Sequence, residues 1–157
     1  MKHYGVRELS RVTKADTKTV MKYLKELVLQ KVVVKHKETR KYPFYEANRQ
    51  SYTYKHEKSE FLVKQIIRSG LIEFLEKNIS PKAIVLFGSV QKGTYHSESD
   101  IDLFINANYR HLNLRNFEKK IGHSIQLLFE SDLHNFNTGL LTNIYNGFVL
   151  SGKLEVL

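Results

Sequence analysis

Residues 83–106, AIVLFGSVQKGTYHSESDIDLFIN, carry the strongest structural signal in the chain. The run from Ala83 to Phe87 is apolar and long enough for one buried strand. Gly88 and Ser89 end this run, and a second strand-like run follows at residues 99–105. The stretch therefore predicts two neighbouring strands separated by a glycine-containing turn and a loop.

The second run contains two carboxylates, Asp100 and Asp102, with one residue between them. On a strand, residues i and i+2 point to the same side, so the two aspartates are expected on one face. The opposite face can pack into a core through Ile101, Leu103 and Ile105. Two ionised carboxylates this close repel each other unless a cation lies between them. Hard oxygen ligands of this kind favour Mg²⁺ or Mn²⁺.

The Gly88–Ser89 pair predicts a turn that can bind phosphate next to the aspartate pair. A glycine after a buried strand permits a tight turn and a close approach of ligand to backbone. A helix that starts at residue 89 or 90 would direct its free N–H groups and positive dipole end at the turn, as in phosphate sites. Lys92 follows and can pair with a phosphate. Together with the aspartates, these residues fit a metal–nucleoside triphosphate.

Gly-Ser, ten residues, then Asp-x-Asp resembles the signature of the DNA-polymerase-β-type nucleotidyltransferase superfamily, in its minimal nucleotidyltransferase branch. The resemblance extends from about residue 52 to the C-terminus, and its motifs are Phe87-Gly88-Ser89, Gly93, Ser99 to Leu103 and Asn146 to Leu150. It implies transfer of a nucleoside monophosphate from an NTP, ATP in the first instance, to an acceptor hydroxyl. Asp100 and Asp102 would be the catalytic metal ligands for Mg²⁺ or Mn²⁺. Gly88, Ser89 and Lys92 would bind the nucleotide.

The chain departs from that family at one position. The family has a third carboxylate on a later strand, and the corresponding strand here is residues 125–129, where Gln126 stands at the expected position. A neutral amide cannot accept the proton of the attacking hydroxyl and is a poorer metal ligand. Glu130 shares the strand parity of Gln126 but lies too far along the chain to replace the acid.

Composition limits the other possibilities. The chain has 157 residues, no cysteine and a net charge of +9. The absence of cysteine excludes a disulfide framework and thiolate metal sites. We expect a soluble cytoplasmic protein without a membrane contact, because the first residues lack a signal peptide and no apolar run approaches a membrane helix. Residues 1–60 hold 15 Lys and Arg against 7 Asp and Glu, whereas residues 61–157 hold 10 against 9.

The basic N-terminal part has the element order of a DNA-binding module. Apolar spacing predicts helices at about 5–12 and 17–30, and β-branched residues then predict a strand at 31–35. A basic loop follows, and residues 43–46 are interpreted as the returning strand. Residues 6–47 resemble a winged helix-turn-helix, in which the second helix of the motif enters the major groove. By that resemblance the residues facing duplex DNA would be Lys14, Thr17, Lys18, Thr19, Lys22, Arg40 and Lys41. The family usually has a further helix before the first one here, so another segment or a second subunit in a homodimer would have to cover the exposed core. A winged helix used only for protein contact is the alternative.

The remaining pattern completes the expected fold. We expect a helix over 52–78 with a break at Ser69-Gly70, a helix at 114–121, a strand at 124–129 and a last helix at 133–145. The fold class is therefore α+β, with an N-terminal winged helix-turn-helix at 1–50 and a small mixed-sheet nucleotidyltransferase domain at 51–157.

Two functions stay open on these observations. The first is an active nucleotidyltransferase, with a protein partner as one possible acceptor, since minimal nucleotidyltransferases paired with HEPN-domain toxins modify proteins. The second is a DNA-binding transcriptional regulator whose nucleotidyltransferase domain senses nucleotide and is catalytically weak or inactive. The Gly-Ser turn and the aspartate pair favour nucleotide binding under both, whereas Gln126 and the basic N-terminal part favour the second.

Overall fold

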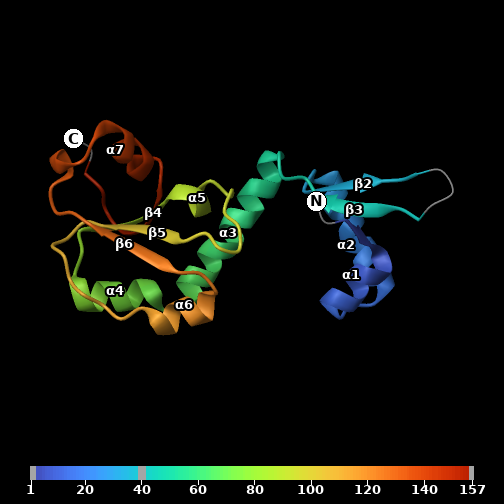
Figure 1. Ribbon diagram of the computed structural model, residues 1–157, viewed down its shortest axis with the longest axis horizontal. Coiled ribbons are helices and arrows are strands. Elements are labelled where there is room, and N and C mark those ends of the chain that lie inside the picture. Colours follow the sequence, from blue (N-terminus) through green and yellow to red (C-terminus); the bar gives the residue numbers. More distant parts are fainter. Residues whose placement is uncertain (1–2, 39–41, 156–157) are drawn as a thin grey trace. The chain divides into compact units, whose positions relative to one another are not determined.

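The computed structural model describes residues 3–38 and 42–155. Within it the chain divides into two compact units, residues 1–57 and 58–157, and each unit has its own hydrophobic core. The division falls inside one helix, α3 (Tyr52–Arg68), rather than after residue 50. Figure 1 labels the helices α1–α7 and the strands β2–β6.

The first unit combines two helices with a small antiparallel sheet. Its elements before α3 are β1 (Tyr4–Gly5), α1 (Val6–Thr13), α2 (Thr17–Leu29), β2 (Val33–His36) and β3 (Phe44–Ala47). The strand order is β1-β3-β2. The two helices and the β2–β3 pair agree with the sequence-based expectation. Strand β1 was not expected, because a strand of two residues is too short to show the alternation of apolar and polar side chains that indicates a strand.

Local chemistry sets the bounds of α2. The side chain of Asp16 accepts a hydrogen bond from the backbone N–H of Thr19 at 2.9 Å, which caps the N-terminus of the helix. Lys14 takes a left-handed conformation (φ 55°) and turns the chain between α1 and α2. Along α2, Val20 and Leu24 are buried against Tyr45 of β3. The apolar stripe of α2 therefore forms the core of this unit.

The second unit is built on a four-stranded mixed sheet with the order β6-β5-β4-β7. β4 pairs antiparallel with β5 and with β7, whereas β5 and β6 are parallel. The elements after α3 are α4 (Leu71–Ile79), β4 (Ala83–Phe87), α5 (Gly88–Gln91), β5 (Ile101–Ile105), α6 (Arg115–Ile121), β6 (Ile125–Phe129), the 3-10 helix η1 (Leu133–Asn135), α7 (Thr138–Tyr145) and β7 (Phe148–Gly152).

Helices cover both faces of this sheet. α4 and α6 lie on one face and α7 on the other (Figure 1). Alternate residues of β5 divide between the two cores: Leu103 packs toward α4 and α6, and Phe104 packs toward α7. Both side chains are fully buried. The central strands β4 and β5 are therefore packed on both faces, and the site described below lies at their ends.

Three expectations differ from the structure. The helix expected over 133–145 is interrupted, because the side chain of Asn137 accepts the N–H of Leu140 at 2.9 Å and starts α7 separately from η1. The strand expected from residue 99 begins at Ile101, so Asp100 lies just before β5. Strand β7 was not expected, although its sequence Phe-Val-Leu-Ser-Gly is apolar enough for a strand.

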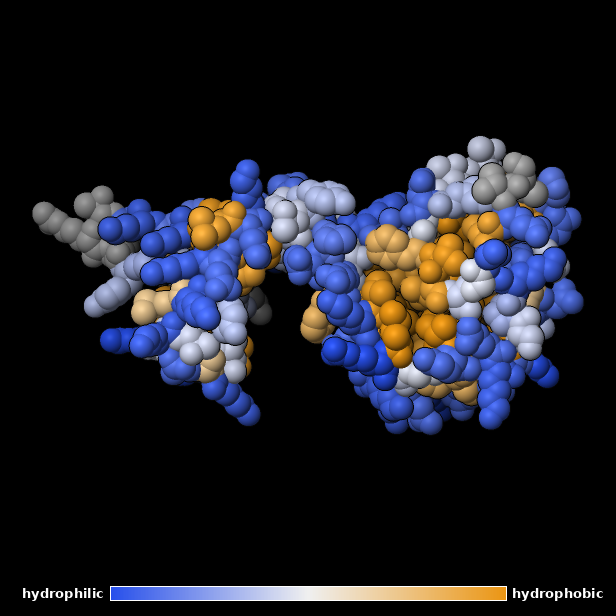
Figure 2. Space-filling model, turned by 180° about the vertical axis from the view of Figure 1, so that it is seen from behind, coloured by the Kyte–Doolittle hydropathy of each residue, from blue (hydrophilic) through white to orange (hydrophobic). Residues whose placement is uncertain are grey.

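Figure 2 shows apolar surface gathered on one face of the unit of residues 58–157. Exposed large apolar side chains in this unit include Phe61 on α3 and Val149 on the edge strand β7. None of the helices in residues 3–38 and 42–155 combines the length and the apolar character that a bilayer crossing requires.

Candidate functional site

The turn after β4 is shaped by Gly88. This residue has a φ of +74°, a left-handed conformation that side-chain-bearing residues avoid. A Cβ atom added there would lie 2.2 Å from Oδ2 of Asp102, far inside van der Waals contact. The backbone at Gly88 thus lies directly against the second carboxylate of the aspartate pair. A glycine is required both for the turn and for this contact.

The two carboxylates stand at the start of β5. Asp102 is the register partner of Phe87, the residue before Gly88, and Ile101 and Leu103 on either side are fully buried. Burial is the main cause that raises the pKa of Asp102, and the negative charge of Asp100 raises it further. The two carboxylates are therefore close enough to repel. A cation bound to both would favour their ionised forms.

Ser89 and Lys92 lie on and after the short helix α5. Ser89 is half-buried, and its carbonyl accepts the N–H of Thr94 at 3.0 Å, which closes the chain into a compact loop. Nζ of Lys92 donates to Oδ1 of Asn143 on α7 at 3.2 Å. Since α5 has only four residues, its dipole is weak, and the N–H groups of the turn itself are the donors a phosphate would meet.

The pairing register of β5 and β6 shows which residue stands where the family has its third acid. Gln126 on β6 pairs directly with Asp102 on β5, and its side chain is exposed. No third acid replaces it within the part of the chain that the structure describes, because no group of three His, Cys, Asp or Glu residues there could hold a metal. Glu130 is engaged elsewhere: its Oε1 accepts the N–H groups of Ser131 at 2.8 Å and Asp132 at 3.0 Å.

Asp100 and Asp102 fit a hard divalent cation. They offer carboxylate oxygens, and because Gly88 has no Cβ the Asp102 carboxylate can lie directly against the turn. Mg²⁺ is commonly bound by one or two carboxylates, with waters and substrate phosphates completing its six ligands. Two carboxylates next to the Gly88 turn are consistent with that pattern.

Sequence reasoning missed several residues near the aspartate pair. The ring of Tyr95 is buried, and its hydroxyl donates to the carbonyl of Lys58 on α3 at 2.9 Å. Nδ1 of His123 lies 2.8 Å from the carbonyl oxygen of Ser99. Because these contacts join residues 24 to 37 positions apart, no local pattern could have revealed them.

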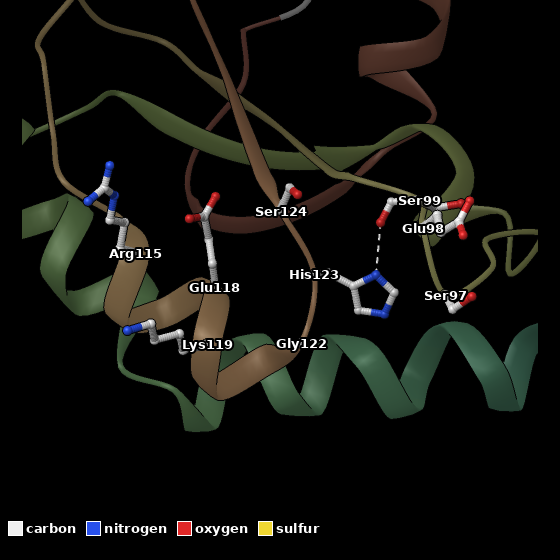
Figure 3. A pocket seen from close by; sticks show the side chains of 9 residues that line it. All are labelled: Ser97, Glu98, Ser99, Arg115, Glu118, Lys119, Gly122, His123 and Ser124. Carbon is white, nitrogen blue, oxygen red and sulfur yellow. Dashed lines mark hydrogen bonds between the residues drawn. The ribbon is translucent and has the colours of Figure 1, made fainter.

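A cavity of about 340 Å³ lies close to this region (Figure 3). It separates the loop before β5 from helix α6, and its lining is Ser97, Glu98, Ser99, Arg115, Glu118, Lys119, Gly122, His123 and Ser124. Neither aspartate nor Gly88 belongs to that lining. The cavity is therefore a neighbour of the carboxylate site and is not the site itself.

The residues predicted to face DNA lie in the first unit. Lys14, Thr17, Lys18 and Lys22 are exposed, and Lys25 adds a third exposed lysine on α2. Thr19 is different, because its hydroxyl donates to Oδ2 of Asp16 at 2.6 Å and so stabilises the helix start. Arg40 and Lys41 lie outside the described residues.

Comparison with known families agrees with the geometry of the second unit. The family model described as polymerase beta, nucleotidyltransferase, matches residues 69–154, more than half of the chain. The chain therefore belongs to this nucleotidyltransferase family. The matched range includes the Gly88 turn, both aspartates and Gln126, and residues 1–68 lie outside it. A comparison with curated proteins found no match.

Proposed function

We propose that the protein is a metal-dependent nucleotidyltransferase that binds an NTP at the Gly88–Asp102 site. The observation that carries the proposal is the contact between the Gly88 backbone and the Asp102 carboxylate. This contact supports the proposal because a turn suited to phosphate would then lie beside a carboxylate suited to a cation. Membership of the nucleotidyltransferase family supports the same reaction class.

Each residue has a defined part in this proposal. Asp100 and Asp102 would hold Mg²⁺ or Mn²⁺, which neutralises the triphosphate and lowers the pKa of an attacking hydroxyl when bound. The N–H groups at Gly88 and Ser89 would donate to phosphate oxygens. Lys92, held near α7 by Asn143, would pair with a phosphate after releasing that amide. ATP is the first nucleotide to test.

The proposed reaction moves one group. The acceptor oxygen forms a bond to the α-phosphorus while the bond from that phosphorus to the bridging oxygen of the β-phosphate breaks, and pyrophosphate leaves. The acceptor proton passes to water, because Gln126 at the position beside Asp102 cannot take it. We therefore propose slow transfer, with a hydroxyl of a protein partner as one acceptor.

Incubation with each labelled NTP, Mg²⁺ or Mn²⁺ and candidate acceptors tests this proposal. Label should appear on an acceptor with the wild type and disappear with Asp100→Ala/Asp102→Ala. Glu98→Ala is the matched control, since it removes an exposed carboxylate from the same loop. Calorimetry should show metal-dependent NTP binding to the wild type and the control only. Equal binding by the double variant would overturn the proposal.

A second candidate function is DNA binding by a winged helix in the first unit, with the nucleotide site acting as a weak or inactive sensor. The observation that favours it is the row of exposed lysines Lys18, Lys22 and Lys25 on α2. Residues 1–57 carry 14 Lys and Arg against 6 Asp and Glu, whereas residues 58–157 carry 11 against 10. The sheet order β1-β3-β2 behind two helices is compatible with a winged helix.

Fluorescence anisotropy with duplex DNA tests the second candidate. Binding should weaken steeply with salt, because each neutralised phosphate contributes a log–log slope of about −0.9. Lys18→Ala and Lys22→Ala should each reduce affinity, and Lys77→Ala on α4 is the control on the second unit. A folded sample that binds no duplex at about 50 mM salt would leave this unit as a protein-contact module. Sedimentation on DNA would show whether a homodimer forms.

A further inference from the structure

Asp100 needs support that its own strand does not provide. It is exposed and lies just before β5, whereas Asp102 is fixed between buried neighbours within the strand. An exposed carboxylate outside the strand, such as that of Asp100, can turn away from Asp102. A cation site made of these two carboxylates then loses one ligand. The backbone on either side of Asp100 must therefore be restrained if both carboxylates are to face one cation.

Two hydrogen bonds from the segment before β6 provide this restraint. On the N-terminal side, the carbonyl oxygen of Ser99 lies 2.8 Å from Nδ1 of His123 (Figure 3). On the C-terminal side, the N–H of Ile101 donates to the carbonyl of Ser124 at 2.8 Å. The Ser99 carbonyl belongs to the peptide bond that leads into Asp100. Both peptide groups that flank Asp100 are thus held by consecutive residues.

The first of these bonds fixes the tautomer of the histidine. A carbonyl oxygen can only accept, so Nδ1 of His123 must carry the proton and donate. In a neutral ring Nε2 then has no proton. This is an unambiguous spectroscopic prediction that does not depend on any bound ligand.

His123 is in turn held by buried structure. Its ring packs edge-to-face against Tyr95, with 5.6 Å between the ring centroids. Tyr95 is only 8% exposed and is anchored to Lys58 through its hydroxyl, while the Lys58 ammonium lies 4.3 Å from the centre of the tyrosine ring. A series of contacts therefore runs from α3 through Tyr95 and His123 to the peptide before Asp100.

We propose that His123 is a positioning residue that holds Asp100 beside Asp102 for cation binding, which rests on the proposed function. The Nδ1–H group fixes the Ser99–Asp100 peptide, and Tyr95 fixes the imidazole. Without that donor the carbonyl of the Ser99–Asp100 peptide loses its bond to His123, while the Ser124 carbonyl still holds the following peptide through the N–H of Ile101. Asp100 then spends less time in the binding arrangement. The affinity for a divalent cation then falls, whereas the fold is preserved by the cores on both faces of the sheet.

Variants can separate the hydrogen bond from packing. His123→Phe keeps an aromatic ring against Tyr95 and removes the donor. His123→Asn loses the ring, but its amide nitrogen takes about the place of Nδ1 and restores the donor. His111→Phe is the matched control, because His111 is exposed in the loop before α6. All proteins are compared well below their melting temperatures.

The first measurement is long-range ¹⁵N–¹H NMR of the imidazole in the metal-free wild-type protein. It should show the Nδ1–H tautomer for His123. An Nε2–H tautomer would overturn the proposal, because that form has no proton to donate to Ser99.

The second measurement is Mn²⁺ affinity, followed by the electron paramagnetic resonance signal of the free ion. His123→Phe should bind Mn²⁺ about fivefold to tenfold more weakly, in keeping with the loss of one hydrogen bond. His123→Asn should stay within about twofold of wild type, and His111→Phe should be unchanged. Wild-type affinity in His123→Phe, or equal weakening in His123→Asn, would overturn the positioning role alone. A wild-type protein that binds no Mn²⁺ would overturn the proposed function and this inference with it.

Discussion

A single methyl group at residue 88 would collide with the carboxylate of Asp102, because a Cβ there would lie 2.2 Å from Oδ2. The φ of +74° adds a second penalty that any side chain would meet. Both the backbone conformation and the neighbouring Asp102 carboxylate therefore favour glycine at this position. At the residue scale, Gly88 therefore links the stability of the second unit to the geometry of its site.

Gly88→Ala should reduce both stability and metal binding. The left-handed backbone alone costs about 1–2 kcal/mol, and the collision with Asp102 adds to that cost. Urea unfolding and Mn²⁺ titration measure the two effects. Gly139→Ala on α7 is the control, because its added Cβ would meet only ordinary contact, 3.5 Å from Oδ1 of Asn137. A Gly88→Ala protein with wild-type stability and affinity would contradict the described turn.

The raised pKa of Asp102 predicts a pH dependence with a definite sign. A carboxyl whose folded pKa lies above its unfolded value lowers stability once pH rises through the folded pKa, because the folded state then holds an unfavourable charge. Asp102→Asn should therefore stabilise the metal-free protein at neutral pH. The gain should disappear as pH falls below the ordinary aspartate pKa, where both states are protonated.

Thermal unfolding from pH 3 to 8 checks this prediction, with Glu98→Gln as the exposed-carboxyl control. Saturating Mg²⁺ should raise the melting temperature of the wild type and leave Asp102→Asn unchanged. An Asp102→Asn protein that is less stable than wild type at neutral pH without metal would contradict the assigned cause of the pKa shift.

At the scale of elements, the register between β5 and β6 decides what residue 126 can do. Gln126 lies directly beside Asp102, so an acid there would join the two existing carboxylates. Gln126→Asp should increase the rate of nucleotidyl transfer, because a third carboxylate can bind a second cation and accept the proton. Gln126→Asn keeps the side chain neutral and should leave the rate unchanged. Single-turnover assays with labelled NTP compare the three proteins, and a rate that falls in Gln126→Asp would show that the site works differently.

At the scale of the whole molecule, the two units have separate cores and unequal charge. We therefore expect their binding activities to be separable by substitution. Lys18→Ala/Lys22→Ala should weaken DNA binding and leave the affinity for Mg²⁺–NTP unchanged. Asp100→Ala/Asp102→Ala should do the reverse. Anisotropy and calorimetry on the wild type and the two double variants test this, and loss of both activities in either double variant would contradict it.

The sequence by itself determined the elements that depend on local signals. The apolar run 83–87, the Gly88–Ser89 pair and the alternation through Asp100 and Asp102 were enough to predict two strands, the turn between them and the family of the second unit. The two helices of the first unit followed from apolar spacing, and the first hairpin strand followed from β-branched residues. These features are encoded within a few residues, because backbone propensity and side-chain period act over short distances.

Only the tertiary structure decided which residues support the site. The β5–β6 register placed Gln126 beside Asp102, and folding brought Asn143 to Lys92 and His123 to Ser99 across 51 and 24 residues. The edge strand β7 likewise depends on its pairing with β4. Such contacts leave no periodic trace in the sequence, because they join segments whose spacing is set by the packing of the whole sheet and its helices.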